Sequence, residues 1–150
     1  MTVSTTESLE SRVAVLEDER AILRLLHAYG HHLDYGLAEA WLDCFTEDGV
    51  FEVQRATPPG GLYRGRDELR GFVSAHTHAP DKWHKHVVVD PIIRTDGDSA
   101  EVESYFMRLD RIDDIPRIRT FGRYRDSLRR GEDGRWRLAK RVVEVEARLT

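Results

Sequence analysis

From residue 83 to residue 94 the chain reads WHKHVVVDPIIR, and from this stretch onward its apolar residues recur with a period of two. This alternation is typical of β-strands, because successive side chains of a strand point to opposite faces of a sheet. Asp96-Gly97 and Asp133-Gly134 are turn sequences, whereas residues 113–116 predict a less regular connection. We therefore expect four long strands, over residues 83–94, 100–111, 118–130 and 135–147.

The sequence before this stretch predicts helices. Apolar residues between positions 9 and 33 fall near helical spacing, which indicates one long helix that could break near Asp18 and that Gly36 ends. Residues 1–6 are expected to be frayed. Further along, the pattern predicts a short helix over 37–45, a strand over 50–54 after the turn Asp48-Gly49, a loop over 57–61 and a third helix over 67–75.

Helices followed by a run of long antiparallel strands indicate an α+β fold in one domain, residues 1–150. Strands of this length must twist strongly. We expect a cone-shaped, strongly curved, mostly antiparallel sheet closed by the N-terminal helices. The cavity of that cone is where a functional site is expected.

Composition narrows the function classes. The 150 residues include 23 Lys and Arg against 27 Asp and Glu, a net charge of −4, which argues against nucleic-acid binding. No apolar run is long enough for a membrane span, and the N-terminus lacks a signal peptide, so we expect a cytoplasmic protein. The single cysteine, Cys44, is expected in the core. A run of arginines near the last turn is interpreted as a charge-paired hairpin: Arg123, Arg125, Arg129 and Arg130.

Two segments hold the candidate catalytic groups. Asp34 lies in the last turn of the long helix, where it could solvate the helix end, pair with His31 or act chemically. His84 and His86 share one face of the first long strand. A carboxylate that orients an imidazole makes a general-base unit, because it fixes the tautomer and stabilises the imidazolium.

Several motifs resemble SnoaL-like proteins of the nuclear transport factor 2-like superfamily. The similarity covers residues 10–145 and is more specific for the fold than for the activity. The motifs are AILRLLHAY (21–29), WLDCFTEDGVF (41–51), YRGRDEL (63–69), GRYRD (122–126) and DGRWRL (133–138), with Asp34 and His86 between them.

Within that superfamily the chain is most similar to a branch with scytalone dehydratase, hexachlorocyclohexane dehydrochlorinase and bile acid 7α-dehydratase. The resemblance implies an Asp-His pair for elimination reactions, at Asp34 and His86; His84, two residues away, is the natural control for the choice of histidine. It also implies a hydrogen-bond donor at Tyr29 and an arginine near the leaving group at Arg141. An acidic residue of the bile acid enzyme and a second histidine of scytalone dehydratase have no counterpart here.

The residues themselves leave other interpretations open. Tyr29 has core spacing, and the strand parity of Arg141 does not say whether it enters the cavity or an oligomer face. Three phenylalanines are candidates for an apolar substrate wall: Phe51, Phe72 and Phe106.

The pairs His76-Thr77-His78 and His84-Lys85-His86 also permit a metal interpretation. Zinc sites usually bring tighter ligand spacing or carboxylate support, so we favour no metal and no cofactor.

We expect a cofactor-independent lyase that carries out a dehydratase-like or dehydrohalogenase-like elimination on a small, cyclic or aromatic apolar substrate. The same base would also support an isomerase or cyclase. The sequence is also compatible with a non-catalytic ligand-binding protein and with the small subunit of a ring-hydroxylating oxygenase. A homodimer or homotrimer is expected, because the second face of the sheet, assigned to Val142, Val143 and Val145, needs cover.

Overall fold

A computed structural model describes residues 7–55 and 60–149. Three helices precede the long strands. Helix α1 spans Leu9–Asp34 without a break at Asp18, and the Ser8 hydroxyl caps it by accepting a hydrogen bond from the backbone N–H of Ser11. Helix α2 spans Ala38–Leu42, and α3 spans Gly65–Ala75.

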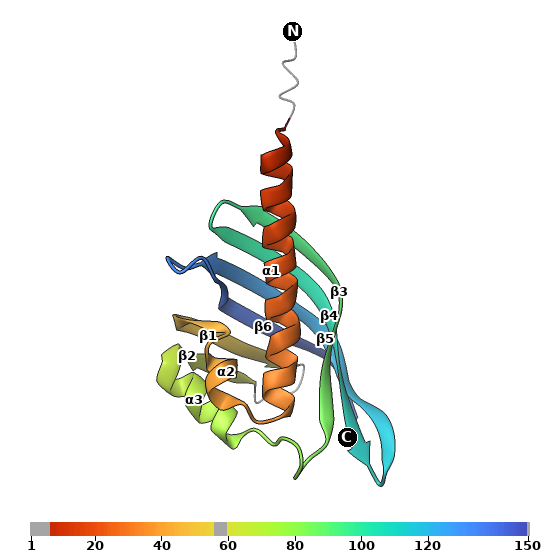
Figure 1. Cartoon of the computed structure of the whole chain (residues 1–150). Coiled ribbons are helices and arrows are strands. Elements are labelled where there is room, and N and C mark those ends of the chain that lie inside the picture. The colour runs from red at the N-terminus through yellow and green to blue at the C-terminus, as the bar shows by residue number, and fades with distance from the viewer. Residues whose placement is uncertain (1–6, 56–59, 150) are drawn as a thin grey trace.

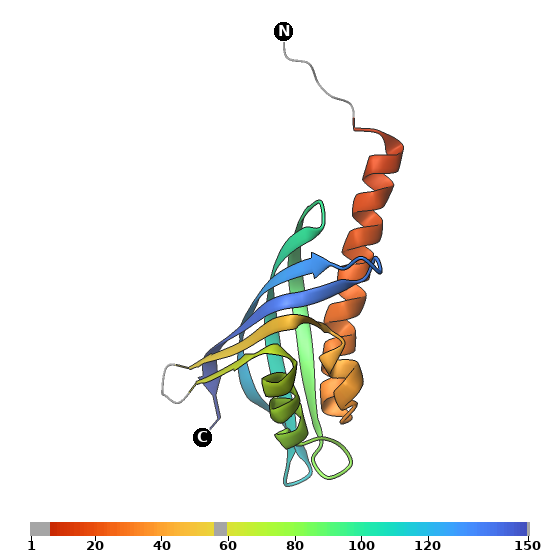
Figure 2. The same ribbon diagram turned by 90° about the vertical axis from the view of Figure 1, so that its left-hand side faces the viewer.

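Six strands form one curved sheet in the order β2-β1-β6-β5-β4-β3 (Figure 1). All pairs are antiparallel except β1 with β6, which run parallel. The α+β prediction is confirmed: α1 lies across the inner face of an unclosed sheet, as Figures 1 and 2 both show. The strands are β1 (Phe45–Arg55), β2 (Gly61–Arg64), β3 (His84–Asp96), β4 (Ser99–Ile112), β5 (Ile115–Arg130) and β6 (Trp136–Arg148).

The core lies between α1 and the inner face of the sheet. Ile22, Leu26 and Leu33 of α1 are buried there, at the helical spacing that the sequence indicated. Cys44 is buried in the same core, and burial raises the pKa of its thiol to about 11, so it is an inert core residue. No described helix is long and apolar enough to cross a membrane.

Three local predictions, for the start of β1, for β2 and for the connection between β4 and β5, were wrong. The strand expected from residue 50 starts at Phe45, because Asp48-Gly49 lies within β1 at a register shift and not before it. Strand β2 was missed inside a glycine-rich segment. The connection expected to be irregular is a tight turn, in which Asp113 and Asp114 adopt φ of 51° and 61°.

Two of the three valines that the sequence assigned to the second face of the sheet do not lie on it. Val143 and Val145 lie on the inner side, where Val143 is buried and Val145 packs against the core. An irregularity between β5 and β6, where Ser127 pairs with Lys140 but Leu128 with Leu138, shifts the alternation. The predicted charge-paired hairpin is confirmed, since each of its four arginines contacts a carboxylate: Arg123, Arg125, Arg129 and Arg130.

Candidate active site

The carboxylate of Asp34 is the centre of the candidate site. Its Oδ1 accepts hydrogen bonds from Nδ1 of His86 at 2.6 Å and Nδ1 of His84 at 2.9 Å. Its Oδ2 accepts the backbone N–H of His86 at 2.9 Å. The structure thus brings together Asp34 and His86, the two residues that the sequence singled out, and adds His84 to them.

Close packing of α1 on β3 makes this contact. Asp34 is the last residue of α1, and both histidines lie at the start of β3. Gly30, one turn earlier, faces the backbone of His86, and a Cβ at position 30 would lie 2.9 Å from the His86 carbonyl oxygen. A glycine at this position therefore lets the helix approach the strand.

Burial and hydrogen bonding set the charges of the pair. Burial disfavours the Asp34 carboxylate, but the hydrogen bonds from His84 and His86 outweigh it and hold the pKa of Asp34 well below its usual range. Burial also lowers the pKa of His86, and the hydrogen bond and charge of Asp34 offset this only in part. His86 is therefore neutral at neutral pH and, because its Nδ1–H points to a carboxylate, Nε2 carries the free lone pair.

His84 differs from His86 in having an acceptor at each ring nitrogen. Its Nδ1 faces Asp34, and its Nε2 lies 2.6 Å from the carbonyl oxygen of Thr77. Because its side chain is fully buried, His84 is a structural partner of Asp34, a contact that the sequence analysis did not predict.

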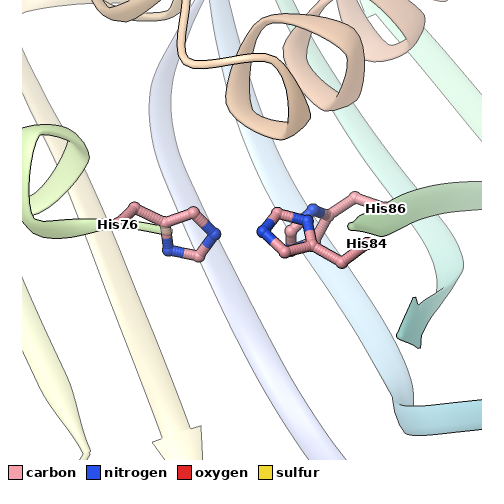
Figure 3. Close-up of side chains that lie close together, drawn as sticks. All are labelled: His76, His84 and His86. Carbon is pink, nitrogen blue, oxygen red and sulfur yellow. The ribbon is translucent and has the colours of Figure 1, made fainter. Parts of the chain in front are cut away.

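His76 completes a cluster of three imidazoles. It follows α3 and faces His84 and His86 from the opposite side (Figure 3), with ring centroids 5.3 and 5.7 Å away. Its buried Nε2 has no hydrogen-bond partner among the described residues. Burial, and then the repulsion that a protonated His86 and Arg108 would exert, lower the pKa of His76 to about 3, so this ring is neutral.

The same three histidines are the residues that could hold a metal ion. One ligand atom from each lies within 4.8 Å of the others. In the present arrangement, however, both nitrogens of His84 face acceptors, so a three-imidazole site requires the Thr77 carbonyl to move. His78 packs against Gly36 instead, so the two His-x-His pairs do not assemble as four ligands.

Tyr29 and Arg141 lie in a separate buried cluster. The Arg141 guanidinium donates from Nε and Nη2 to Asp126 at 2.8 and 2.7 Å, between the rings of Tyr29 and Tyr124. Burial raises the pKa of Tyr29 to about 12. Arg141 thus faces inward, but the core encloses it, and its catalytic role and that of Tyr29 stay predictions.

The three phenylalanines predicted to form a substrate wall also lie in different places. Phe51 packs in an aromatic cluster with Trp41 and Phe72, and Phe106 stacks on Tyr124 with centroids 4.5 Å apart. Only Phe72 reaches the histidines, with its ring 5.5 Å from His76. Phe72 and His76 both line a groove of about 710 Å³ beside α3.

Sequence reasoning missed the role of His76 and the second contact of Asp34. His76 lies in a polar segment with no periodicity between α3 and β3. The direction of its side chain depends on the path of that segment, which the sequence does not predict. For His84 a signal was present, because it shares the strand face of His86 and one carboxylate oxygen can accept two hydrogen bonds.

Comparison with solved structures supports the fold. The chain is similar to a protein of unknown function from Mycobacterium tuberculosis, at 28% identity and a TM-score of 0.79, over 94% of this chain and 78% of that one. An NTF2-like protein with a cystatin-like fold from Novosphingobium aromaticivorans gives 22% identity and a TM-score of 0.82, over 97% and 92%. A protein from Catenulispora acidiphila, solved in complex with S-DNPA, gives 27% identity and a TM-score of 0.70, over 90% and 95%.

No curated protein matches the chain. A family model does match, and it covers residues 14–142, which include all of the candidate site. The family includes enzymes such as cyclases and isomerases, while many structural neighbours have no known function. This chain belongs to the SnoaL-like domain family.

Proposed function

We propose that the chain is a cofactor-independent enzyme in which His86 removes a proton from carbon. The observation that carries the proposal is the hydrogen bond from His86 Nδ1 to Asp34 Oδ1 at 2.6 Å. It leaves Nε2 as the basic nitrogen, and Nε2 makes no hydrogen bond to a described residue. A positioned, neutral imidazole is the ordinary general base of enzymes near neutral pH.

The favoured reaction is an elimination. His86 Nε2 takes a proton from the carbon next to a carbonyl, the C–H electron pair forms the new double bond, and the group on the neighbouring carbon departs with its own bonding pair. If that group is hydroxide, it needs a proton as it leaves. The imidazolium that forms on His86 can supply that proton from Nε2, so the proton taken from carbon leaves with the hydroxide as water and His86 returns to its neutral form.

Isomerisation and cyclisation share the first step with elimination. An isomerase or cyclase would use the same deprotonation and return the proton to another carbon or oxygen. A non-catalytic binding protein would have no use for an ionised, buried Asp34 that orients a neutral His86. The geometry therefore favours an enzyme over a binding protein more strongly than it favours elimination over isomerisation.

Proton exchange tests the proposal without knowledge of the full reaction. Cyclic ketones and β-hydroxy carbonyl compounds are incubated with the protein in D2O, and deuterium incorporation at the α-carbon is followed by NMR. We expect exchange by the wild type and a loss of about a hundredfold or more in His86→Ala. Arg20→Ala, at an exposed position of α1, is the control and should keep full exchange. Equal exchange by wild type and His86→Ala would contradict the proposal.

A further inference from the structure

A strongly basic pocket lies next to the three histidines. It has a volume of about 410 Å³ and is lined by Thr77, the residue whose carbonyl faces His84. Its single acidic residue is Asp110. Five cations from five different segments also line it: Arg55, Lys82, Arg108, Arg119 and Arg148.

Most of this positive charge is not neutralised. Arg108 donates to Asp110 at 2.7 and 3.2 Å, which uses the only carboxylate of the pocket. The other four cations form no ion pair with any residue in 7–55 or 60–149. In this acidic chain, with a net charge of −4, many other arginines of the sheet contact carboxylates, among them Arg123, Arg129 and Arg130.

The strand register connects the pocket to the proposed base. His86 pairs with Arg108 across β3 and β4, Arg108 pairs with Thr120 on β5, and Thr120 pairs with Arg148 on β6. The four residues therefore form one row across the sheet. Arg108 follows the buried Phe106 at the next alternate position, so the row continues the inner face.

The remaining cations reach the pocket from the elements around this row. Arg55 ends β1, beside β6, and Lys82 lies in the connection from α3 to β3. These segments lie toward the lower part of the view in Figure 2, together with the end of β6. The positive charge of Arg108 also contributes to the low pKa of both His76 and His86, as expected for a cation close to them.

We infer that the substrate is an organic anion, whose carboxylate or phosphate group is held in this pocket while its reacting carbon faces His86. The inference rests on the proposed function and specifies its substrate class. Arginine forks suit both carboxylate and phosphate oxygens. A polyanion such as nucleic acid does not fit, because the positive charge is confined to one concave pocket of an acidic protein.

Binding of simple probes tests the inference separately from turnover. Benzoate, phenyl phosphate and neutral benzamide are titrated into the full chain at pH 7 and low salt, with amide NMR shifts as the readout. We expect at least one of the two anions to bind about tenfold or more tightly than benzamide, with shifts centred on Arg108 and Thr120. The tighter anion identifies the group as carboxylate or phosphate.

Paired double variants show whether the pocket is responsible. Arg119→Gln/Arg148→Gln should weaken the preferred anion by about tenfold or more and leave benzamide unchanged. Arg12→Gln/Arg20→Gln removes the same charge from the exposed part of α1 and should leave both unchanged. Equal affinity for anions and benzamide, or equal losses in both double variants, would overturn the inference.

The two proposals can fail separately. His86→Ala should retain anion binding, since Arg119 and Arg148 are intact. If anions bind through the pocket but His86→Ala keeps full proton exchange, the base assignment fails and the anion site stands. If exchange depends on His86 but anions bind no better than benzamide, the substrate class fails and the base assignment stands.

Discussion

Asp34 holds His86 at two points, because its Oδ1 accepts from the ring Nδ1 and its Oδ2 accepts from the backbone N–H of the same residue. A carboxylate that binds both the ring and the main chain fixes the tautomer and the direction of the ring together. The end of α1 therefore positions the imidazole at the start of β3, and it is not a solvated helix terminus.

Replacing Asp34 by asparagine should separate charge from shape. Asp34→Asn keeps an oxygen for the backbone N–H of His86 but removes the negative charge that supports the imidazolium. We expect turnover to fall by about a hundredfold to ten-thousandfold. The lower limb of the pH–rate profile should move to lower pH, because loss of a nearby negative charge lowers the pKa of His86 further.

The double variant provides the check. Asp34 and His86 act as one unit, so Asp34→Asn combined with His86→Ala should be little slower than the slower single variant. Two outcomes would show that the hydrogen bond has no catalytic role. One is a double variant in which the losses of the two single variants add in full, and the other is a wild-type rate in Asp34→Asn.

His84→Ala should shift the same profile in the opposite direction. His84 contacts Asp34 and Thr77 through its two ring nitrogens, and its Coulomb interaction with His86 lowers the pKa of that ring. Removal of His84 should therefore move the lower limb of the pH–rate profile to higher pH. It should also reduce the free energy of unfolding by about 2 to 3 kcal/mol, the usual loss for a buried hydrogen bond to a charged group. Urea unfolding and pH–rate profiles measure the two effects. An unchanged pH limb would contradict this prediction.

The architecture was readable from the sequence because it rests on long periodic segments. Residues 9–33 repeat at helical spacing, and every strand from residue 84 onward has more than ten residues, so local signals were averaged over several turns or pairs. The short strand Gly61–Arg64 was not readable, since its conformation comes from pairing with β1 rather than from its own glycine-rich sequence.

The site was readable only in part. Asp34 and His86 stood out by chemistry and position, but the number of partners of Asp34 depends on how closely α1 approaches β3 at Gly30. The inward direction of Arg141 depends on the irregular pairing of β5 with β6, where Leu138 and Lys140 face consecutive residues. Such register shifts have no clear sequence signature, so parity arguments fail beyond them.

Chelation should leave the protein unchanged. The nitrogens of His84 already face Asp34 and the Thr77 carbonyl, so a metal ion has no third imidazole ligand without a loop movement. We expect EDTA to alter neither the melting temperature nor proton exchange, and elemental analysis to find no stoichiometric transition metal. Stoichiometric zinc that stabilises the fold would contradict this prediction and assign the three histidines to a metal centre.

Acid should destabilise the fold through His76. Its pKa is about 3 in the folded protein and near 6.5 in the unfolded chain, so the unfolded state binds more protons between these values. Stability from this group is full above pH 6.5 and decreases as the pH falls, by about 2 kcal/mol between pH 7 and pH 5. In urea unfolding, the free energy of unfolding of His76→Phe should therefore decrease by about 2 kcal/mol less than that of the wild type between pH 7 and pH 5. An equal loss in both proteins would show that His76 is protonated in the folded state.

Arg141 and Asp126 form a buried ion pair whose disruption should destabilise the fold. Arg141→Met leaves the Asp126 carboxylate buried without its partner, and we expect it to reduce the free energy of unfolding by about 3 to 5 kcal/mol. Arg141→Met/Asp126→Leu removes both charges and should recover most of that loss, because apolar replacement of a whole buried pair is close to neutral. Turnover per folded molecule then separates the two roles of the arginine. If Arg141 only supports the core between Tyr29 and Tyr124, the double variant should keep wild-type turnover, whereas a stable double variant that has lost turnover would place Arg141 in the catalytic machinery.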